Sequence, residues 1–596
     1  MSLFTDSSLC LVPSGVKDGK LYSVKPTDGS GDLTFSRGSD IEATRVAANG
    51  YIEKAKVNLV LQSNQFDTSW LSSGTTETGG QAGYDGTNDA WLLQRSDGLA
   101  RFVYQFNAHT GVGTFSVYIK KGNVDWVLLS NGAGENRYFD LTNGVLGATG
   151  TAIDSKIESV GGGWFRCSIA VANSSEVRIY PAVGNGTVSG LVGANIYIQD
   201  AQLNYGLVAQ EYQETTTTSV ITGITNDMPR LDYSGGASCP SLLLEPSRQN
   251  LLTNDTYYGG SDWSKIGVSP SANNATSPEG VTNAVLLSET AINDQHSLYP
   301  TVSVTSGNAY TASCFVKQGT GSAAPQYIGF RFRGGGFADA GGLVVDLVNK
   351  VATYEAGSLT GYKIEDYGNG WLRVSITQSA TVTSSSAGLV LFFNNNISGS
   401  YSTDYLGNVN ADMLVYGAQI EQASYSSSLI PTYGTSATRT QDLSVTASPS
   451  TSQFGQTEGT IFTEIEINAI TSGSYSRVLN LKNSGGSNQI YIQQNDSKIA
   501  GAVFNGSNQF VASTSSGFLS VGSVYKIALA YKNSDYALYI NGTQISTGLA
   551  SGLGTLSVDR LDFTTGAGSI GLGNEVKQSL VFNTRLTNAD LATLTA

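Results

Sequence analysis

Few residues of this chain have the types and spacing that acid–base chemistry needs. Glu464 and Glu466 lie in the segment Glu464–Ala469 (EIEINA). This is the nearest match to the strand pattern Glu-x-Asp-x-x-Glu, whose outer carboxylates act as nucleophile and acid/base in glycoside hydrolysis. Glu466 replaces the central Asp and Ala469 replaces the final Glu, so the acid/base is missing. We therefore predict an ordinary edge strand here and no catalytic centre.

The two histidines do not indicate a nucleophilic site. A Ser-His or Cys-His pair needs an imidazole as its base, and His109 and His296 do not correspond in the two repeated parts of the chain described below. We expect both in loops. The sequence has no Walker loop, HExxH motif or EF-hand loop. We predict a protein that is not an enzyme and uses no cofactor.

Two polar stretches carry the oxygen ligands that calcium prefers. Their residues are Asn226 and Asp227 in one stretch and Asp404, Asn408, Asn410 and Asp412 in the other. Backbone carbonyls could complete such a site, but a solvated loop is the simpler interpretation. The sequence leaves metal binding open.

The tryptophans offer flat faces on which a pyranose packs well. Trp164 and Trp371 each follow a Gly-rich turn and open a Trp-x-Arg-x-Ser strand, so we expect them in a core. Trp91 and Trp126 have no Trp at the matching position of the second copy. Of these two, Trp126 is the better candidate for carbohydrate binding.

Other aromatic and charged residues of the repeat have structural interpretations. Arg166 and Arg373 lie on the strand face of the repeated Trp, where each could stack on the indole or, as we predict, form an ion pair. The expected partners are Glu158 and Glu365. Trp70 and Trp263, which recur in matching positions, are expected to plug the sandwich edge. The residues that carry chemistry therefore depend on how a repeated scaffold positions them.

The chain contains a long tandem repeat. Ile157–Ile169 (IESVGGGWFRCSI) and Ile364–Ile376 (IEDYGNGWLRVSI) are nearly the same segment, and other anchors recur around them in the same order. The matched pairs include Asn58 with Asn250, Trp70 with Trp263, Asp140 with Asp346, and Ala201-Gln202-Leu203 with Ala418-Gln419-Ile420. The period exceeds that of solenoid repeats, whose units cannot bury a core alone. Each copy is long enough to be a domain.

Composition narrows the function classes. Charged residues are 13% of the chain and the net charge is −14, which argues against nucleic-acid binding because that needs clustered Lys and Arg. No apolar run is long enough for a transmembrane helix, and the first residues lack the pattern of a signal peptide. The four cysteines do not duplicate with the repeat, so we expect buried or free thiols.

Strand patterns dominate the rest. Short β-branched and aromatic runs alternate with Gly, Asn and Ser clusters, which predicts an all-β protein of tandem antiparallel sandwiches or jelly rolls. Near the end, Asn541-Gly542 indicates a type I′ hairpin, and Thr587 with Asp590 has capping-box spacing for a short helix. Arg45, Arg230 and Arg439 mark three junctions that we expect to be equivalent seams between domains.

The last part of the chain resembles the concanavalin A-like (laminin-G-like) jelly roll. The resemblance rests on Ala537–Gly542 (ALYING) and on the closing segment Leu580–Leu586 (LVFNTRL). It implies a fold and no particular ligand.

The two long repeats resemble a module of tailed-bacteriophage tail, head and fibre proteins. Its motifs are an opening NLL…W segment, a middle GnGWxRxS segment and a closing GAQlE segment, present at Asn58–Trp70, Gly161–Ser168 and Asp200–Leu203 and again at Asn250–Trp263, Gly368–Ser375 and Gly417–Glu421. The first copy departs from this pattern at Asp200, where the module has Gly. The resemblance implies a virion surface protein with carbohydrate-binding-like β-sandwiches, commonly a homotrimer.

These observations define the expected organisation and function. The predicted parts are a virion-docking segment at 1–57, module 1 at 58–232, module 2 at 233–442, a linker at 443–458 and a concanavalin A-like domain at 459–596. We expect a tail- or head-fibre adhesin on the virion, made in the host cytoplasm, that contacts other virion proteins and host glycans. The alternatives are an architectural virion protein without glycan binding and, less favoured, a glycan depolymerase.

Overall fold

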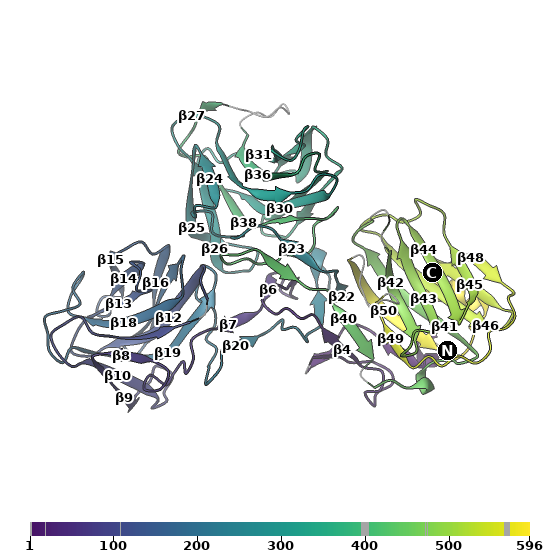
Figure 1. The fold of residues 1–596 in the computed structure, drawn as a ribbon, viewed down its shortest axis with the longest axis horizontal. Coiled ribbons are helices and arrows are strands. Elements are labelled where there is room, and N and C mark those ends of the chain that lie inside the picture. Colours follow the sequence, from purple (N-terminus) through teal and green to yellow (C-terminus); the bar gives the residue numbers. More distant parts are fainter. Residues whose placement is uncertain are drawn as a thin grey trace.

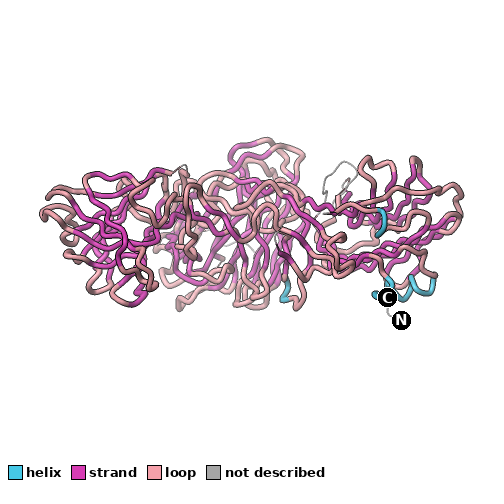
Figure 2. Tube along the Cα trace, turned by 90° about the horizontal axis from the view of Figure 1, so that it is seen from below, coloured by secondary structure: helices cyan, strands magenta, loops and turns pink. Residues whose placement is uncertain are grey.

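The computed structural model describes residues 3–17, 19–107, 109–394, 404–446, 448–470, 473, 475–564 and 573–596. Its regular structure is almost entirely antiparallel β, which confirms the predicted fold class. Figure 1 shows three lobes: module 1 in purple and blue, module 2 in teal, and the C-terminal domain in green and yellow. Figure 2 shows the lobes side by side in an elongated molecule, with both chain ends on the C-terminal lobe.

Module 1 is a sandwich of two six-stranded sheets. The first sheet runs, in spatial order, β16 (Asp154–Gly161), β17 (Trp164–Val171), β12 (Gly113–Lys121), β19 (Asn195–Tyr205), β10 (Ala90–Arg95) and β9 (Thr75–Gln81). The second runs β15 (Val145–Thr149), β14 (Asn136–Asp140), β13 (Trp126–Ser130), β18 (Glu176–Ala182), β11 (Phe102–Phe106) and β8 (Leu71–Ser73). Alternate residues of both sheets, such as Val103, Val127 and Ile169, form one buried cluster between them.

Module 2 repeats this strand order. Its first sheet is β34 (Gly361–Asp366), β35 (Leu372–Ser379), β30 (Ala309–Gln318), β38 (Asp412–Glu421), β26 (Thr282–Glu289) and β25 (Val268–Thr276). Its second is β33 (Val351–Ala356), β32 (Gly342–Asp346), β31 (Tyr327–Gly334), β36 (Ser384–Phe393), β28 (Ser297–Pro300) and β24 (Trp263–Ile266), with β29 (Val302–Val304) also paired to β36. The equivalence of the sheets shows that the sequence repeat is a repeat of one fold.

A buried asparagine joins the opening and closing motifs of each copy. The Asn58 amide donates to the carbonyls of Ala201 and Gln213 at 3.1 and 2.7 Å, and its oxygen accepts the Leu203 N–H at 3.1 Å. Asn250 makes the matching bonds in module 2, with Ala418, Ile430 and Ile420. Because a buried amide must be satisfied, these repeated residues hold the fold together and do not mark a ligand site.

The repeated tryptophans are buried, as predicted, but on the outer face of the first sheet. Trp164 and Trp371 are each 2% exposed, while the alternate positions, such as Val374 and Ile376, form the sandwich core. Trp371 belongs to a second cluster with Ile52, Phe315, Tyr416 and Leu429. The outer face of this sheet is therefore covered by other segments of the same chain.

The neighbouring arginine does not form the predicted ion pair. The Arg166 guanidinium lies over the Tyr118 ring, 5.5 Å from its centroid, and donates to Ser116 Oγ at 3.1 Å. Glu158, directly opposite on edge strand β16, instead pairs with Lys156 at 2.7 Å. The second copy repeats this with Arg373, Phe315, Ser313, Glu365 and Lys363. Pairing with an exposed lysine keeps the glutamate solvated and avoids a desolvation cost.

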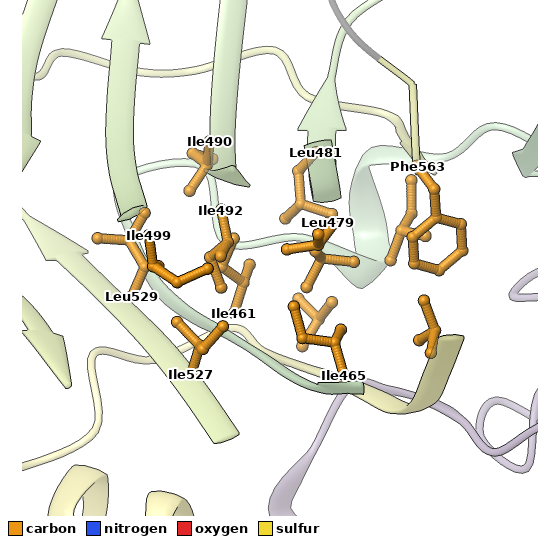
Figure 3. Packing of buried hydrophobic residues seen from close by; sticks show 14 of the residues in the cluster. Ile461, Ile465, Leu479, Leu481, Ile490, Ile492, Ile499, Ile527, Leu529 and Phe563 are labelled. Carbon is orange, nitrogen blue, oxygen red and sulfur yellow. The ribbon is translucent and has the colours of Figure 1, made fainter. Parts of the chain in front are cut away.

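The C-terminal domain is a larger sandwich. Its eight-stranded sheet comprises β21 (Arg230–Asp232), β22 (Ser241–Leu244), β50 (Asn574–Phe582), β41 (Glu458–Ile467), β46 (Val524–Lys532), β47 (Tyr536–Ile540), β48 (Thr543–Gly548) and β1 (Leu9–Leu11). The facing sheet comprises β45 (Asn508–Ser513), β44 (Lys498–Asn505), β43 (Asn488–Asn495), β42 (Tyr475–Lys482) and β49 (Arg560–Asp562). Figure 3 shows Ile461, Ile465 and Ile527 of the first sheet facing Leu479 and Ile492 of the second.

Two local predictions in this domain are confirmed. Asn541 and Gly542 connect β47 to β48 with φ of 48° and 76°, as a type I′ turn requires. Thr587 caps helix α2 (Asn588–Thr595), and its Oγ accepts the Asp590 N–H at 3.2 Å. The other helical elements are α1 (Leu3–Asp6) and the 3-10 turns η1 (Ser234–Gly236) and η2 (Thr451–Gln453).

The structure places the domain boundaries differently from the sequence analysis. Within 1–57, β1 pairs with β50, and Leu9, Leu11, Leu21 and Leu33 enter the C-terminal core. The boundary predicted at 232/233 falls inside the hairpin of β21 and β22, which also joins β50. Strands this short are not stable alone, so they add to an existing sheet edge and cover it.

The predicted linker and the remaining short strands also join segments distant in sequence. Within 443–458, β40 (Leu443–Thr446) closes a four-stranded sheet with β2 (Val16–Lys17), β3 (Lys20–Leu21) and β4 (Leu33–Ser36). The two-stranded pairs are β5 (Thr44–Val46) with β6 (Ile52–Lys54), β7 (Lys56–Asn58) with β20 (Val220–Thr222), β23 (Arg248–Asn250) with β39 (Ala437–Arg439), and β27 (Asn293–Asp294) with β37 (Tyr405–Leu406).

A buried charge network, which we call the junction network, lies where these segments meet. Arg230 Nη1 lies 2.7 Å from Glu245 Oε2, and Arg230 also pairs with Asp442. Arg37 Nη1 lies 3.0 Å from Asp442 Oδ1, and Arg439 Nη1 lies 3.1 Å from Glu245 Oε2. Burial alone would raise the pKa of Asp442, but the charges of Arg230 and Arg37 hold that pKa below its usual value.

The junction network contains the arginines of two of the three predicted seams. Arg230 and Arg439 share Glu245, whereas Arg45 forms a separate, partly exposed pair with Glu53 at 2.8 Å. The expectation of three equivalent seams is therefore wrong for Arg45. Arg37, which has no place in that expectation, is the third guanidinium of the network.

Neutralising Asp442 should weaken the whole molecule. Asp442→Asn leaves two buried guanidinium groups without their shared carboxylate, and such a loss costs about 3–5 kcal/mol in the free energy of unfolding. Urea titration of the full chain measures it. Glu158→Gln, which removes the carboxylate of an exposed pair, is the control and should cost under about 1 kcal/mol. Equal effects of the two variants would show that the junction network is not a central support.

Candidate functional site

The outer face of the second sheet of module 1 carries an unusual number of aromatic side chains. Strand β11 alternates inward Val103 with outward Phe102 and Tyr104, and Phe106 continues the outward series at its end. Phe106 is 63% exposed, and Phe102 and Tyr104 are partly exposed. Strand β11 therefore presents the rings of Phe102, Tyr104 and Phe106 in a line on the outer face of the sheet.

Strand register extends this line into a row across the sheet. Phe102 of β11 lies opposite Tyr180 of β18, because Val103 pairs with Ile179. Tyr180 lies opposite Leu128 of β13, and Leu128 lies opposite Tyr138 of β14. Residues directly opposite in antiparallel strands point to the same face and are close enough to touch. We call the outward-facing set Phe102, Tyr104, Phe106, Trp126, Leu128, Tyr138 and Tyr180 the aromatic face; Leu128 and Tyr180, in the middle of the row, are each only 8% exposed.

Four rings of the aromatic face, those of Phe102, Tyr104, Phe106 and Tyr180, contact one another. The centroids of Phe102 and Tyr180 are 4.4 Å apart, and Tyr104 lies 5.4 Å from both Phe102 and Phe106. The last pair is edge-to-face at 89°, a favoured geometry for aromatic pairs. Packing of each of these rings against its neighbour restricts the side-chain conformations in the unliganded protein.

Trp126, the residue predicted as a carbohydrate contact, lies beside this row. It is partly exposed on β13, where it pairs with Asp140 and Ala182. A Cβ at Gly147 would lie 2.4 Å from Trp126 Cζ3, so only glycine leaves room for the indole over β15. The structure thus places Trp126 on the same sheet face as tyrosines and phenylalanines that the sequence analysis did not select.

The charges on the aromatic face cancel. Arg178 lies over the Phe102 ring at 4.8 Å from its centroid. Its Nε and Nη2 donate to the two oxygens of Glu176 at 2.7 and 3.0 Å, and Nη1 donates to the Tyr180 hydroxyl at 3.2 Å. The hydrogen bond with Glu176 raises the pKa of Arg178 above its ordinary value. The surface offers rings and paired polar groups, which suits an uncharged ligand.

The equivalent face of module 2 carries different side chains. Tyr327 occupies the place of Trp126, since it lies opposite Asp346 as Trp126 lies opposite Asp140. The Phe392 ring sits on Gly329, where a Cβ would lie 1.9 Å from it, and Phe392 is only 2% exposed. The two copies share a scaffold but differ in what this face exposes.

The remaining tryptophans belong to the fold. Trp70, Trp91 and Trp263 are 5%, 7% and 2% exposed and lie within or against the sandwich cores. Trp70 Nε1 donates to the Gln62 carbonyl at 3.2 Å, and Trp263 Nε1 makes the matching bond to Asn254 at 3.1 Å. Their recurrence therefore reflects packing of the opening motif inside each sandwich.

The carboxylates weighed for hydrolysis are engaged with neighbours. Glu464 Oε2 accepts from Gln578 at 2.6 Å, and Glu466 pairs with Lys577 at 3.1 Å. The predicted edge strand is wrong, because β41 lies between β46 and β50 inside the sheet. The histidines lie in loops of different modules, as predicted, and are not brought together.

The described residues contain neither a cluster of metal ligands nor a helix that could span a membrane. Asn408 Oδ1 accepts the Asn410 N–H at 3.0 Å, and Asp412 Oδ1 accepts the Gly321 N–H at 3.0 Å. Among the residues described, no group of three or more Asp, Glu, His or Cys is placed to share a metal ion. Nor does any helix in those residues have the length and apolarity to cross a bilayer. All four cysteines are free.

A cavity of about 790 Å³ lies at the junction of the N-terminal segment, module 2 and the C-terminal domain. Its charged walls already bond to one another. Lys577 pairs with Glu466, Lys363 with Glu365, and Asp232 accepts the Val46 N–H at 2.7 Å. We therefore assign this cavity to domain packing and the candidate site to the aromatic face.

Comparison with known proteins finds matches among solved structures alone, and those reported below each cover about a quarter of this chain. No protein-family model matches the chain, and no curated protein matches it. Among solved structures, the Ruminococcus gnavus IT-sialidase CBM40 bound to alpha2,3 sialyllactose is 14% identical, with a TM-score of 0.21, and the match covers 24% of this chain and 84% of that chain. The receptor-binding domains of botulinum neurotoxins also match.

Two of these further matches have similar statistics. The binding domain of botulinum neurotoxin serotype D is 13% identical over 26% of this chain and 40% of that chain, with a TM-score of 0.23. The SAP-like pentraxin of Limulus polyphemus is 15% identical over 24% of this chain and 70% of that chain, with a TM-score of 0.20. Each match spans about a quarter of this chain, so the site rests on its own geometry.

Asp200 departs from the repeat at a strained position. Its φ is 53°, and Gly417 occupies the equivalent place with a φ of 57°, a region that glycine adopts at no cost. Asp200 is 7% exposed, and its Oδ2 accepts the Tyr84 hydroxyl at 2.9 Å. Burial raises the pKa of Asp200 to about 6, and the charges of Asp89 and Asp85 add to this rise.

Replacing Asp200 by Asn should therefore stabilise module 1 at neutral pH. A folded pKa above the ordinary value means that the stabilising contribution is complete below about pH 4 and is lost as the pH rises through 6. Asp200→Asn removes this loss, and we expect a gain of up to about 3 kcal/mol above pH 6 that vanishes toward pH 4. Urea midpoints between pH 4 and 8 measure it.

Asp227→Asn, on an exposed loop, is the matched control for this pH series. Its stability curve should run parallel to that of the wild type. A parallel curve for Asp200→Asn as well would contradict the assignment of the pH-dependent loss to this carboxyl.

Proposed function

We propose that this chain is a glycan-binding adhesin on the surface of a tailed-phage particle, a tail- or head-fibre component that attaches the virion to its host. The observation that carries the glycan-binding part is the aromatic face of module 1. Soluble proteins rarely expose contiguous apolar patches, and those they expose mark binding sites. Here Phe106 is 63% exposed and Phe102 and Tyr104 beside it are partly exposed, with Trp126 partly exposed on the same face of the sheet.

The chemistry of the aromatic face suits a neutral sugar chain. The C–H side of a pyranose packs on aromatic rings, while polar groups at the ring edges orient its hydroxyls. The Tyr180 hydroxyl and the Arg178–Glu176 pair lie among the rings and can serve this purpose. Binding of this kind needs no catalytic group, and we propose that the chain is not an enzyme.

Weak single sites fit display in several copies. A shallow face binds one sugar chain weakly, but linked copies acting on one surface gain avidity. We propose a homo-oligomer, with a trimer favoured by the resemblance of the repeats to phage fibre modules. We further propose that the protein is made in the host cytoplasm, is exposed on the virion, and does not contact nucleic acid or insert into membranes.

Docking to other virion proteins would use the N-terminal segment. Its inner residues pack on the C-terminal domain, while Tyr22 and Val24 are 39% and 42% exposed. These residues, with Phe4 at 39% exposed, are available to contact a virion partner. Support for the phage role rests on the repeated sequence motifs.

An architectural role is the second candidate, favoured by one observation. On this face of module 2 Phe392 is buried and Tyr299 and Tyr327 are only partly exposed, so this copy exposes no ring as fully as Phe106 of module 1. In that case the two modules would stabilise or decorate the particle without recognising sugar. Binding measurements separate the two candidates.

Removing one ring from the aromatic face should weaken glycan binding. Trp126→Ala and Tyr104→Ala each delete a stacking surface, and we expect the affinity of the full chain for neutral host-surface glycans to fall about tenfold. A glycan array identifies ligands and calorimetry measures the change. Tyr475→Ala removes an exposed tyrosine of the C-terminal domain and should bind like the wild type.

The same measurements can exclude the adhesin. If no array of host-surface glycans retains the wild-type chain, or if both aromatic-face variants bind as it does, the architectural role stands in its place. Release of reducing ends from host polysaccharide by the wild-type chain would instead indicate a depolymerase.

A further inference from the structure

The entry of module 1 is anchored to module 2 by a lysine. Lys54, in β6 just before module 1 begins, pairs with Glu279 of module 2, and its ammonium lies 5.7 Å from the centroid of the Tyr433 ring. Tyr433 in turn stacks on Tyr205 of module 1, with centroids 5.0 Å apart, and its carbonyl accepts the Val112 N–H at 3.0 Å. The N-terminal segment, module 1 and module 2 are therefore held together at one point.

The charges at this point do not balance. Asp255 of module 2 lies close enough to Lys54 and Glu279 for both charges to act on it, so two carboxylates share one ammonium. The side chains of Lys54 and Glu279 are 14% and 6% exposed, and Asp255 is 1% exposed. Two neighbouring carboxylates that are both removed from water cannot both ionise without a large cost. We call Lys54, Asp255, Glu279 and Tyr433 the module joint.

Asp255 is the carboxyl with the weaker support. Glu279 accepts the Tyr416 hydroxyl, and an amide hydrogen of Asn283 at 2.9 Å, in addition to its ion pair. The Asp255 carboxylate accepts from Thr256 Oγ1 at 3.5 Å, the limit of hydrogen-bond range. Burial raises the pKa of Asp255 to about 7, and the charge of the lysine opposes this rise. Asp255 is therefore the group of the module joint that holds a proton below neutral pH.

The other ionisable side chains of the described residues that act on Asp255 stay neutral. They come from β38, β30, the opening loop of module 2 and its exit, and they are Tyr416, Cys314, Tyr258 and Tyr433. Burial raises the pKa of each of these hydroxyl and thiol groups above its ordinary value. None of them supplies a positive charge, so the charge balance of the module joint depends on the proton of Asp255.

We propose that the module joint is a pH-dependent contact, which holds module 1 against module 2 while Asp255 carries a proton and loosens when that proton is lost. Deprotonation leaves two carboxylates facing one ammonium away from water, and separation of the modules lets water solvate them. An acid whose pKa is raised in the joined state stabilises that state fully below about pH 4, and the contribution is lost as the pH rises through 7. The aromatic face would thus change its position relative to module 2 with pH. This proposal does not depend on glycan binding.

Fluorescence energy transfer across the module joint tests this proposal. Leu99→Cys and Leu406→Cys place one dye on an exposed position of each module, and Cys239→Ser removes the exposed native thiol. We expect one transfer efficiency for the full chain at pH 5. Between pH 5 and pH 8 the ratio of joined to separated molecules should fall by about tenfold or more, and it should level off above pH 7.

Two variants and a control assign the response. Asp255→Asn keeps the shape of the side chain without its charge and should hold the joint closed at both pH values. Glu279→Gln leaves Lys54 to Asp255 alone, which lowers the pKa of Asp255, so the ratio should level off at a lower pH than in the wild type. Asp200→Asn removes the other buried carboxyl with a raised pKa and should respond to pH as the wild type does.

The outcomes are distinct. An unchanged transfer efficiency of the wild type between pH 5 and pH 8 overturns the proposal, as does a pH response that persists in Asp255→Asn or disappears in Asp200→Asn. Loss of the response in Asp255→Asn alone supports it. If the far-ultraviolet circular dichroism of Asp255→Asn shows that this variant does not fold, Glu279→Gln decides: a shift of its response to lower pH supports the proposal, and an unshifted response overturns it.

Discussion

Neutralisation of buried arginines is the constraint on which the arrangement of the molecule depends. Asp442 and Glu245 are shared by Arg37, Arg230 and Arg439, which come from the N-terminal segment, the exit of module 1 and the exit of module 2. A guanidinium is costly to bury without a counter-charge. The three segments can therefore be buried only when they meet and share the two carboxylates. The arrangement of the lobes in Figure 1 thus depends on the ion pairs of the junction network as well as on apolar packing.

Duplication gave the chain two copies of one scaffold and freed one face of each to diverge. The residues that recur, such as Asn58 and Asn250, satisfy buried backbone groups and are needed by both copies. The outer face of the second sheet differs between the copies: the Phe392 ring covers Gly329 in module 2, whereas Phe106 of module 1 is 63% exposed. Under the proposed function, recognition would belong to module 1 and a structural role to module 2.

Local patterns predicted local structure well. Strand alternation, the turn at Asn541 and the cap at Thr587 depend on neighbours in sequence, and all three were found. The aromatic face was predicted only at Trp126, because its row requires the register of four strands that are distant in sequence. The period-two alternation of Phe102, Tyr104 and Phe106 was the available indication. Domain boundaries failed for the same reason, since short strands pair with partners hundreds of residues away.

Pairing of β1 with β50 has a mechanical consequence. Leu9 lies opposite Val581 and Leu11 opposite Ser579, so the leading end of β1 and the trailing end of β50 leave the ladder at the same side. Tension applied between these two strand ends would break the hydrogen bonds of the β1–β50 ladder one after another. Modules 1 and 2 lie between β1 and β50 in the sequence. While β1 stays paired with β50, tension between the two chain ends does not pass through these modules. A pull along the chain would strip β1 from the sheet before it loaded the aromatic face.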